Sequence, residues 1–150
     1  MSHIEEGTTT IKLTALAAAI AHGDTAAIQQ HPCLALLRQA VTLVAEARHG
    51  SVGSTYADYD YRPQTCNTNL ALTIPGELPR GIGLVIDTAT GALTFKGDPW
   101  HHRACFKEIQ QQIVQNYVVL AHAAALRRMR AQVSTQVVEH QVVITGVFHG

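Results

Sequence analysis

A helical pattern in the second half of the chain is longer than a single domain of this size is wide. Asp98 is predicted to cap the helix and Pro99 to take its first position, because both residue types are favoured there. The apolar stripe then recurs every three or four residues and consists of Phe106, Ile109, Ile113, Tyr117, Leu120 and Ala124. If the helix runs to Ala131, about 33 residues span roughly 50 Å. The helix is therefore predicted either to kink or to pack its far end on another surface.

Three arginines lie at the far end of this pattern, namely Arg127, Arg128 and Arg130. Cations near the C-terminus of a helix are stabilised by the negative end of the helix dipole, so structural capping is one interpretation. Contact with an anion or with a partner protein is the other. The cluster is thus a candidate partner-binding site.

The composition indicates one folded domain over residues 1–150. Apolar residues make up 47% of the chain and charged residues only 15%, below the ~25% that is usual in globular proteins. Eleven basic residues balance eleven acidic ones, which argues against nucleic acid or an anionic membrane as the partner. A surface with so few charges favours homo-oligomerisation or a dedicated protein partner.

The first part of the chain alternates short strand and helix patterns. Thr8 to Leu13 have the period of two that is typical of a strand, and Ala15 to Ala21 form an alanine-rich helical stretch that Gly23 ends. A second helix is predicted to begin at Pro32 and to end at Gly50. Its apolar face consists of Leu34, Leu37, Ala40, Val41, Val44 and Ala45.

The middle of the chain has the alternation and the turn residues of a sheet. Strands are predicted over Ser54 to Tyr61, Asn69 to Ile74, Gly81 to Asp87 and Ala92 to Lys96. The turn-forming segment Asp87 to Gly91 predicts an antiparallel hairpin between the last two. The tail, Val133 to Phe148, is predicted to form one or two closing strands. The order β-α-α-β-β-β-β-α-β predicts an α+β fold, with helices packed on one face of a mainly antiparallel sheet.

Nine histidines raise the possibility of a metal site. His101 and Cys105 are four residues apart at the start of the long helix and could share one face, and His102 with Cys105 is the alternative pair. A tetrahedral site needs three or four ligands, so further ligands would have to come from elsewhere, such as His31, Cys33 or Cys66. One transition-metal ion is therefore the alternative to a protein without a cofactor.

Three widely spaced cysteines without a CxxC pair are typical of reduced thiols, and the polar N-terminal segment lacks the apolar core of a signal peptide. A cytoplasmic location is expected. His31-Pro32-Cys33 places an imidazole beside a thiol near a helix N-terminus, where the dipole would lower the pKa of the thiol and create a nucleophile. The alternative is that Cys33 packs inward.

The segment from Tyr56 to Tyr61 gathers three tyrosines and two acidic residues. In an extended strand, Asp58 and Asp60 would lie on one face about 7 Å apart, which suits carboxylate chemistry or a hard cation. The same pattern is typical of a solvated edge strand, with Tyr59 and Tyr61 covering the core. Tyr56, Tyr59 and Tyr61 are also candidates for a partner-binding surface.

Several segments together resemble an uncharacterised family of small proteins from algal plastids, cyanobacteria and other bacteria. They are the Met1-Ser2-His3-Ile4 start, a strand with Ile11-Lys12, the Gly81 to Asp87 strand with its turn at Thr90-Gly91, Trp100, a helix carrying Ile113 to Tyr117, and a strand from Val142 to Val147. The similarity covers roughly Thr8 to Ala21 and Asn69 to Phe148. The segment from Asp24 to Ser54 is longer than in the family, and His101 stands where the family commonly has glycine. The resemblance implies an α+β fold without assigned catalytic residues, and an accessory or adaptor role beside AAA-type ATPases.

The sequence contains no P-loop, GxGxxG or GxSxG motif. The leading prediction is a small soluble non-enzymatic interaction or accessory protein that binds itself or a partner through the long helix and the tyrosine-rich strand. The alternative is a metal-dependent or thiol enzyme that uses His101, His102 and Cys105. A deep pocket lined by Tyr56, Asp58 or Trp100 would instead favour the binding of a small ligand.

Overall fold

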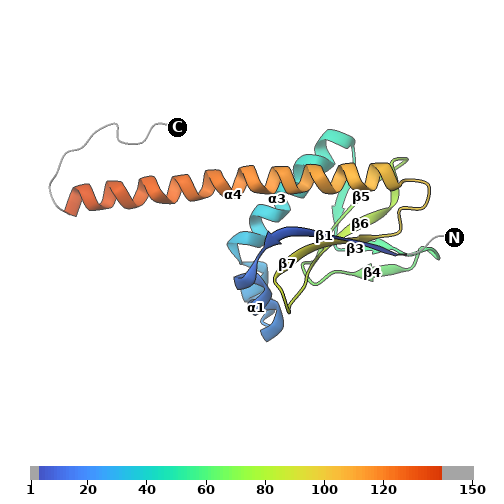
Figure 1. Ribbon diagram of the computed structural model, residues 1–150, viewed down its shortest axis with the longest axis horizontal. Helices are drawn as coiled ribbons and strands as arrows, with labels where there is room; N and C mark the ends of the chain where they lie inside the picture. Colours follow the sequence, from blue (N-terminus) through green and yellow to red (C-terminus); the bar gives the residue numbers. More distant parts are fainter. Residues whose placement is uncertain (1–3, 140–150) are drawn as a thin grey trace.

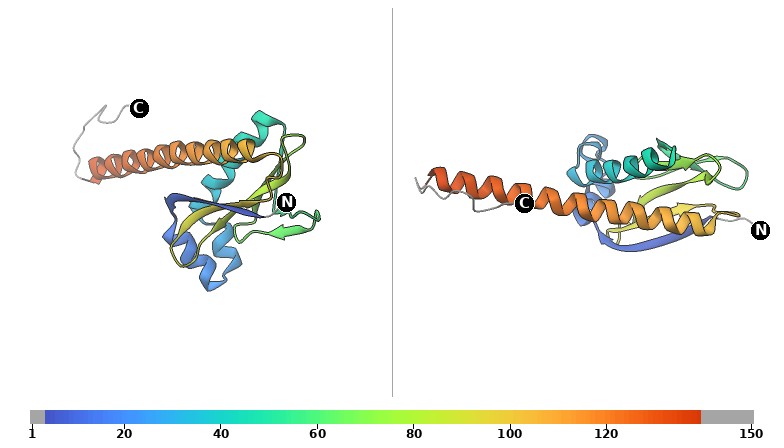
Figure 2. Two further views of the ribbon diagram at one scale, coloured as in Figure 1. Left: turned by 45° about the vertical axis from the view of Figure 1, so that its right-hand side comes forward. Right: turned by 90° about the horizontal axis from the view of Figure 1, so that it is seen from above.

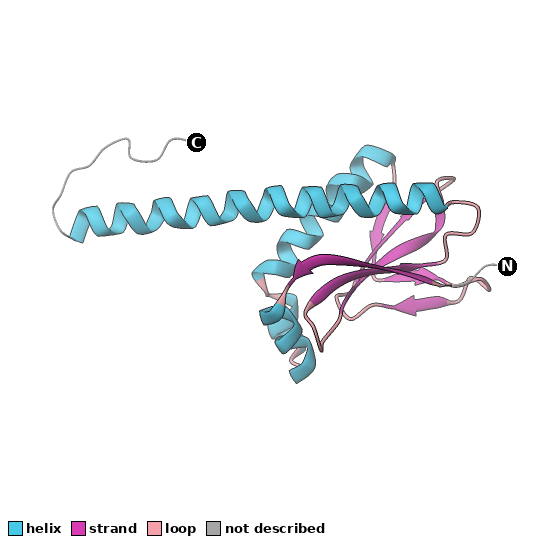
Figure 3. Ribbon diagram, viewed as in Figure 1, coloured by secondary structure: helices cyan, strands magenta, loops and turns pink. Residues whose placement is uncertain are grey.

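A computed structural model of the chain describes residues 4–139, with side chains as far as residue 132. It has a five-stranded sheet, in which every neighbouring pair is antiparallel, and a separate two-stranded hairpin (Figure 1). The large sheet has the order β1 (Glu5–Lys12), β7 (Ala92–Gly97), β6 (Leu78–Ile86), β5 (Leu70–Ile74) and β2 (Ser51–Gly53), and the hairpin pairs β3 (Thr55–Ala57) with β4 (Pro63–Thr65). The helices are α1 (Thr14–His22), α2 (Thr25–Gln29), α3 (Pro32–Arg48) and α4 (Arg103–Glu139). The predicted α+β class is confirmed, as the distribution of helices and strands in Figure 3 shows.

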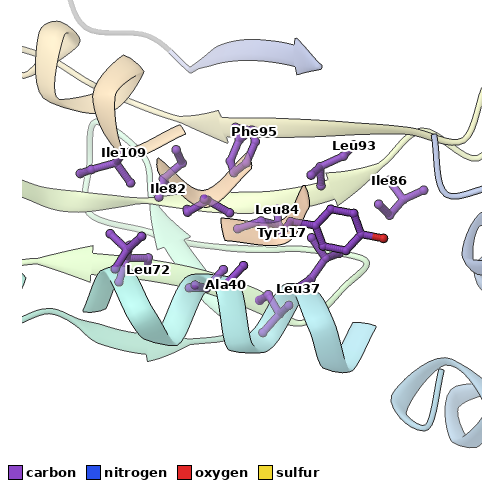
Figure 4. Packing of buried hydrophobic residues seen from close by; sticks show 14 of the residues in the cluster. Leu37, Ala40, Leu72, Ile82, Leu84, Ile86, Leu93, Phe95, Ile109 and Tyr117 are labelled. Atoms are coloured by element: carbon purple, nitrogen blue, oxygen red, sulfur yellow. The ribbon is translucent and has the colours of Figure 1, made fainter. Parts of the chain in front are cut away.

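The main core lies between one face of the large sheet and the helices α3 and α4. Figure 4 shows Leu37 and Ala40 of α3 meeting sheet side chains such as Leu84, while Ile109 and Tyr117 of α4 close the other side. Period-two alternation in the strands sends these side chains to a single face. The result is one contiguous apolar core that α1 also joins.

The β3–β4 hairpin covers part of the opposite face of the sheet. Tyr56 and Cys66 pack there against Ala71, which alternates with the core residues of β5. Gly83 of β6 makes this approach possible, because a Cβ atom at that position would lie only 2.5 Å from the Cys66 Sγ atom.

The helix patterns of the first half are largely confirmed. The predicted helix over Ala15 to Ala21 is α1, and Gly23 ends it in the left-handed conformation with φ of 71°. The helix at Pro32 is α3, whose buried residues are Leu34, Leu37, Ala40, Val41, Val44 and Ala45, as expected from their spacing. α3 ends at Arg48, where His49 takes the left-handed conformation before Gly50. The short helix α2 was not predicted.

The predicted strands are right for the central hairpin and wrong in the segment before it. β6 and β7 pair antiparallel around the turn at Asp87 to Gly91. The expected strand over Ser54 to Tyr61 is shorter, because the chain turns after β3 at Asp58 and returns as β4. β2 is a further strand at the edge of the large sheet.

α4 begins four residues later than predicted, at Arg103 and not at Pro99. Asp98 does not cap α4, because its buried carboxylate pairs with Arg80. The Pro99 carbonyl accepts a hydrogen bond from the His102 amide, and His101 has a φ of 64°. These residues therefore form a turn, and α4 begins at Arg103.

The far end of α4 also differs from expectation. The predicted strand at Val133 to Phe148 is wrong for residues 133–139, which continue α4, and its remainder lies outside the described residues. Neither glycine nor proline interrupts the chain between Ala131 and Glu139. The arginine cluster consequently lies inside the helix, and its interpretation as a C-terminal cap is wrong.

α4 continues well beyond the body of the molecule. Figures 1 and 2 show from three directions that its C-terminal half projects past the sheet and α3. At 1.5 Å per residue, residues 121–139 are about 28 Å long. We call this segment the α4 extension. Of the two predicted alternatives, a kink is not seen in α4 as far as Glu139, and packing of its far end on another surface stays a prediction.

None of the helices within residues 4–139 combines the length and the hydropathy that crossing a bilayer requires.

The two faces of α4 should differ sharply in their contribution to stability. Ile113 is fully buried, whereas Val118 is 52% exposed. Ile113→Ala should lower the free energy of unfolding by about 2–4 kcal/mol because it leaves a cavity, and Val118→Ala should change it by less than about 0.5 kcal/mol. Urea unfolding of both variants measures this difference. Equal effects would contradict the packing of α4 on the core.

Candidate functional site

An apolar groove runs along the outer side of α3 where α4 passes it. Its volume is about 490 Å³, and its lining residues are Ala35, Arg38, Gln39, Thr42, Leu43, Glu46 and Leu120. Leu43 is 47% exposed there although it belongs to a helix with a complete core face. The groove is thus lined by the face of α3 that turns away from the core.

One stripe of α4 runs from the side that faces α3 onto the α4 extension. Gln112 and Asn116 lie on the side of α4 that faces α3, since they hydrogen-bond Arg48 and the Ala40 carbonyl. The same stripe continues at spacings of three and four residues through Val119, Ala123, Leu126 and Arg130. Val119 is 67% exposed and Leu126 is also exposed. We call Val119, Ala123, Leu126, Arg127 and Arg130, together with Leu43 and Glu46 of the groove, the docking surface.

The α4 extension carries positive charge, whereas the remainder of the chain is weakly negative. No acidic residue occurs between Glu108 and Glu139, a stretch that contains Arg127, Arg128 and Arg130. Arg127 and Arg128 are exposed and Arg130 is half-buried. The first 120 residues contain ten acidic and eight basic side chains. The candidate partner-binding arginines therefore stand on a projecting helix, and no acidic residue lies within eight positions of them along the chain.

A second, smaller cavity of about 130 Å³ lies in front of the N-terminus of α4. Asp98 is buried and its Oδ2 atom accepts a hydrogen bond of 2.9 Å from Nη1 of Arg80. The Arg80 guanidinium lies 5.0 Å from the ring centre of Tyr61 and 5.2 Å from that of Trp100. These contacts join β6, the β3–β4 hairpin and the turn before α4. Their first role is to fix where the long helix begins.

The proposed metal ligands are divided between two surroundings. His101 and His102 line the small cavity, whereas the Cys105 Sγ atom lies 4.0 Å from Nη1 of Arg48. Arg48 also binds Glu77 and Glu108, so the Cys105 surroundings are already filled by ion pairs. Within residues 4–139, no group of three or more His, Cys, Asp or Glu side chains is arranged to hold a metal ion.

Burial disfavours the thiolate form at Cys66 and Cys105, because it raises the pKa of both thiols. Burial raises the pKa of the Cys105 thiol, and the nearby Glu77 carboxylate raises it further. His31 accepts a hydrogen bond through Nδ1 from the Cys33 backbone amide, so this imidazole caps α3. Burial raises the pKa of Tyr117 to about 12, and a contact with Cys33 contributes. Cys33 therefore packs toward α4, as the alternative interpretation expected.

The tyrosine-rich segment separates into one buried and two exposed residues. Tyr56 is 6% exposed and packs under the large sheet, whereas Tyr59 and Tyr61 lie exposed in the turn between β3 and β4. The expectation that Tyr59 and Tyr61 cover the core is wrong, because the chain turns at Asp58. Its Oδ1 atom accepts hydrogen bonds from the amides of Asp60 and Arg62, so this carboxylate stabilises the turn.

The groove residues Leu43 and Glu46 were not among the predicted site residues. The spacing of apolar residues predicts the core face of α3 correctly, but it predicts no role for the opposite face of this helix. The one signal in the sequence was Leu43, an apolar residue outside the core stripe in a helix that already had a complete one.

The buried Arg80–Asp98 pair should matter far more than a surface pair. Asp98→Asn leaves the guanidinium without its counter-charge and should cost about 3–5 kcal/mol of stability. Glu6→Gln, which removes the more exposed pair with Lys96, should cost about 1 kcal/mol or less. Thermal unfolding of both variants compares the costs. A small effect of Asp98→Asn would show that the pair does not hold the turn before α4.

Stability should fall at high pH because of Cys66. Burial raises the pKa of this thiol from its ordinary value of 9.0 to about 11. The folded state then holds the proton more tightly than the unfolded state, so the contribution is complete below pH 9 and is lost as the pH rises toward 11. The loss should be about 2 kcal/mol. Urea unfolding across this range, with Cys66→Ala as the control, tests it, and an identical pH dependence in both proteins would contradict it.

No family model, no curated protein and no solved structure matches this chain. The resemblance to the uncharacterised family of plastid, cyanobacterial and bacterial proteins therefore stays a prediction. The case for a function depends on the docking surface and its charge.

Proposed function

We propose that this chain is a non-enzymatic interaction protein that binds another protein chain through the docking surface. The observation that carries the proposal is the α4 extension, a helix that projects from the body with exposed apolar and arginine side chains on it. Among the described residues, Leu120 and Ala121 are the last side chains of α4 that pack against the core. Contact with a partner would bury the exposed apolar side chains of the α4 extension.

The chemistry of the docking surface indicates the kind of partner. The apolar residues Val119 and Leu126 suit the apolar stripe of another helix, because helices pack through side chains at spacings of three and four. Arg130 continues the stripe of α4 and Arg127 lies beside it, and both guanidinium groups suit carboxylates on the partner. The partner surface is therefore helical, with apolar side chains that are flanked by acidic ones.

The alternative of a metal-dependent or thiol enzyme has no specific support in the described residues, since His101 and His102 lie apart from Cys105 in different surroundings. The adaptor role beside an AAA-type ATPase, which the resemblance implies, stays a prediction. So does a cytoplasmic location.

Site-specific photo-crosslinking in the protein's own cells tests this function. A photoreactive amino acid at Leu126 should form adducts with a protein, and peptide mapping should place the crosslink on a helical segment with acidic residues. The comparison position is Tyr59, which is 58% exposed in the β3–β4 turn and belongs to the other surface that the sequence predicts to bind a partner.

Adducts from position 126 that are absent from position 59 would support the proposal. Equal adduct patterns, or none from position 126, would contradict it. The identity of the crosslinked chain is read from the same spectra.

A further inference from the structure

We propose that the partner is a second copy of this chain, bound in a two-fold symmetric arrangement in which each α4 extension lies in the groove of the other copy. This inference rests on the proposed function and names its partner. It is carried by the relative position of the groove and the α4 extension along one helix, and by the charges at each.

The contacts between α3 and α4 give the register. Arg48 lies beside Glu108 and Gln112, whereas Ala40 lies beside Asn116, so the two helices run in opposite directions. Glu46 is consequently level with about residue 112 of α4, and Leu43 with about residue 114, if the spacing is even along both helices.

A two-fold axis through Val119 matches this register. When two antiparallel α4 helices cross at Val119, a residue that lies some number of positions after Val119 faces the residue that lies the same number of positions before Val119 in the second copy. Leu126 then lies level with residue 112 of the second copy, within one helical turn of both Leu43 and Glu46 in the groove. Arg127 comes level with Glu46. Val119, which is 67% exposed, is at the centre, where a contact with its own copy excludes it from water.

The charges of the two surfaces agree with this arrangement. The groove carries Glu46 near the end of α3 and Arg38 eight residues earlier, and the adjoining end of α3 is bordered by Glu77 and Glu108, which both pair with Arg48. In the register above, Arg38 is level with about residue 118 of its own α4, which faces about residue 120 of the second copy and not its arginines. The α4 extension contributes Arg127 and Arg130 without any acidic residue until Glu139. A parallel alignment of the extension with α3 of the second copy therefore brings opposite charges together at both symmetric contacts.

The size of the contact is sufficient for a weak dimer. A helix about 28 Å long and about 10 Å wide covers roughly 280 Å². Each copy takes part twice, once with its extension and once with its groove, so the total buried area is about 1,100 Å². This is near the lower limit for a specific interface, and the dimer should dissociate on dilution.

A charge exchange between two variants of the full chain tests the arrangement. Glu46→Arg places arginine against Arg127 at both contacts, and the double variant R127E/R130E places glutamate against Glu46 at both. Each variant alone should be monomeric at a concentration where the wild type is dimeric. An equimolar mixture should form a heterodimer, because both contacts then pair opposite charges.

Native mass spectrometry and sedimentation velocity give the result, since the two variants differ in mass. Circular dichroism confirms that each variant is folded, as expected for exposed side chains. The inference is supported by a heterodimer in the mixture together with monomeric single species. A monomeric wild type up to about 200 µM, unchanged dimers of either variant, or no heterodimer on mixing would each overturn it.

The two proposals fail separately. A monomeric wild type whose Leu126 position crosslinks to a different protein overturns the second copy and leaves the proposed function supported. Crosslinks within a dimer of this chain support both.

Discussion

The packing of the first half of α4 across α3 and the large sheet is the contact on which the other features depend. Ile109 and Ile113 are fully buried there, and Tyr117 is nearly so. They join the apolar faces of helices α1, α3 and α4 and of strands β5, β6 and β7 into one core. The same contact sets the direction of α4, and thereby aims the α4 extension away from the body. The buried N-terminal half of α4 and the exposed α4 extension are thus parts of one helix.

Two groups of ion pairs position the N-terminal half of α4. The Arg80–Asp98 pair, with Tyr61 and Trp100 around the guanidinium, holds the turn at which α4 begins. Arg48 binds Glu77 and Glu108 at the other side and joins the end of α3 to the first turns of α4. Both arrangements therefore lie at the start of α4 and fix its position on the body.

The parts of the fold that follow from local patterns could be predicted from the sequence. The core face of α3 follows from spacings of three and four residues, and the β6–β7 hairpin from its turn residues. The start of α4 could not be predicted, because Asp98 pairs with Arg80, which is 18 residues away. The groove was missed for a similar reason, since α3 and α4 form it only after they have packed. The arginines were identified, but their place inside a continuing helix was not.

The account depends on α4 remaining one straight helix beyond the body. The most direct measurement is the distance between spin labels at Lys107→Cys and Gln132→Cys, in a chain whose three native cysteines are replaced by alanine and which is diluted with unlabelled protein. Pulsed electron paramagnetic resonance should give a narrow distribution near 38 Å, because 25 residues rise about 1.5 Å each. A distribution centred below about 25 Å would mean that the chain folds back on the body, and would contradict a projecting α4 extension.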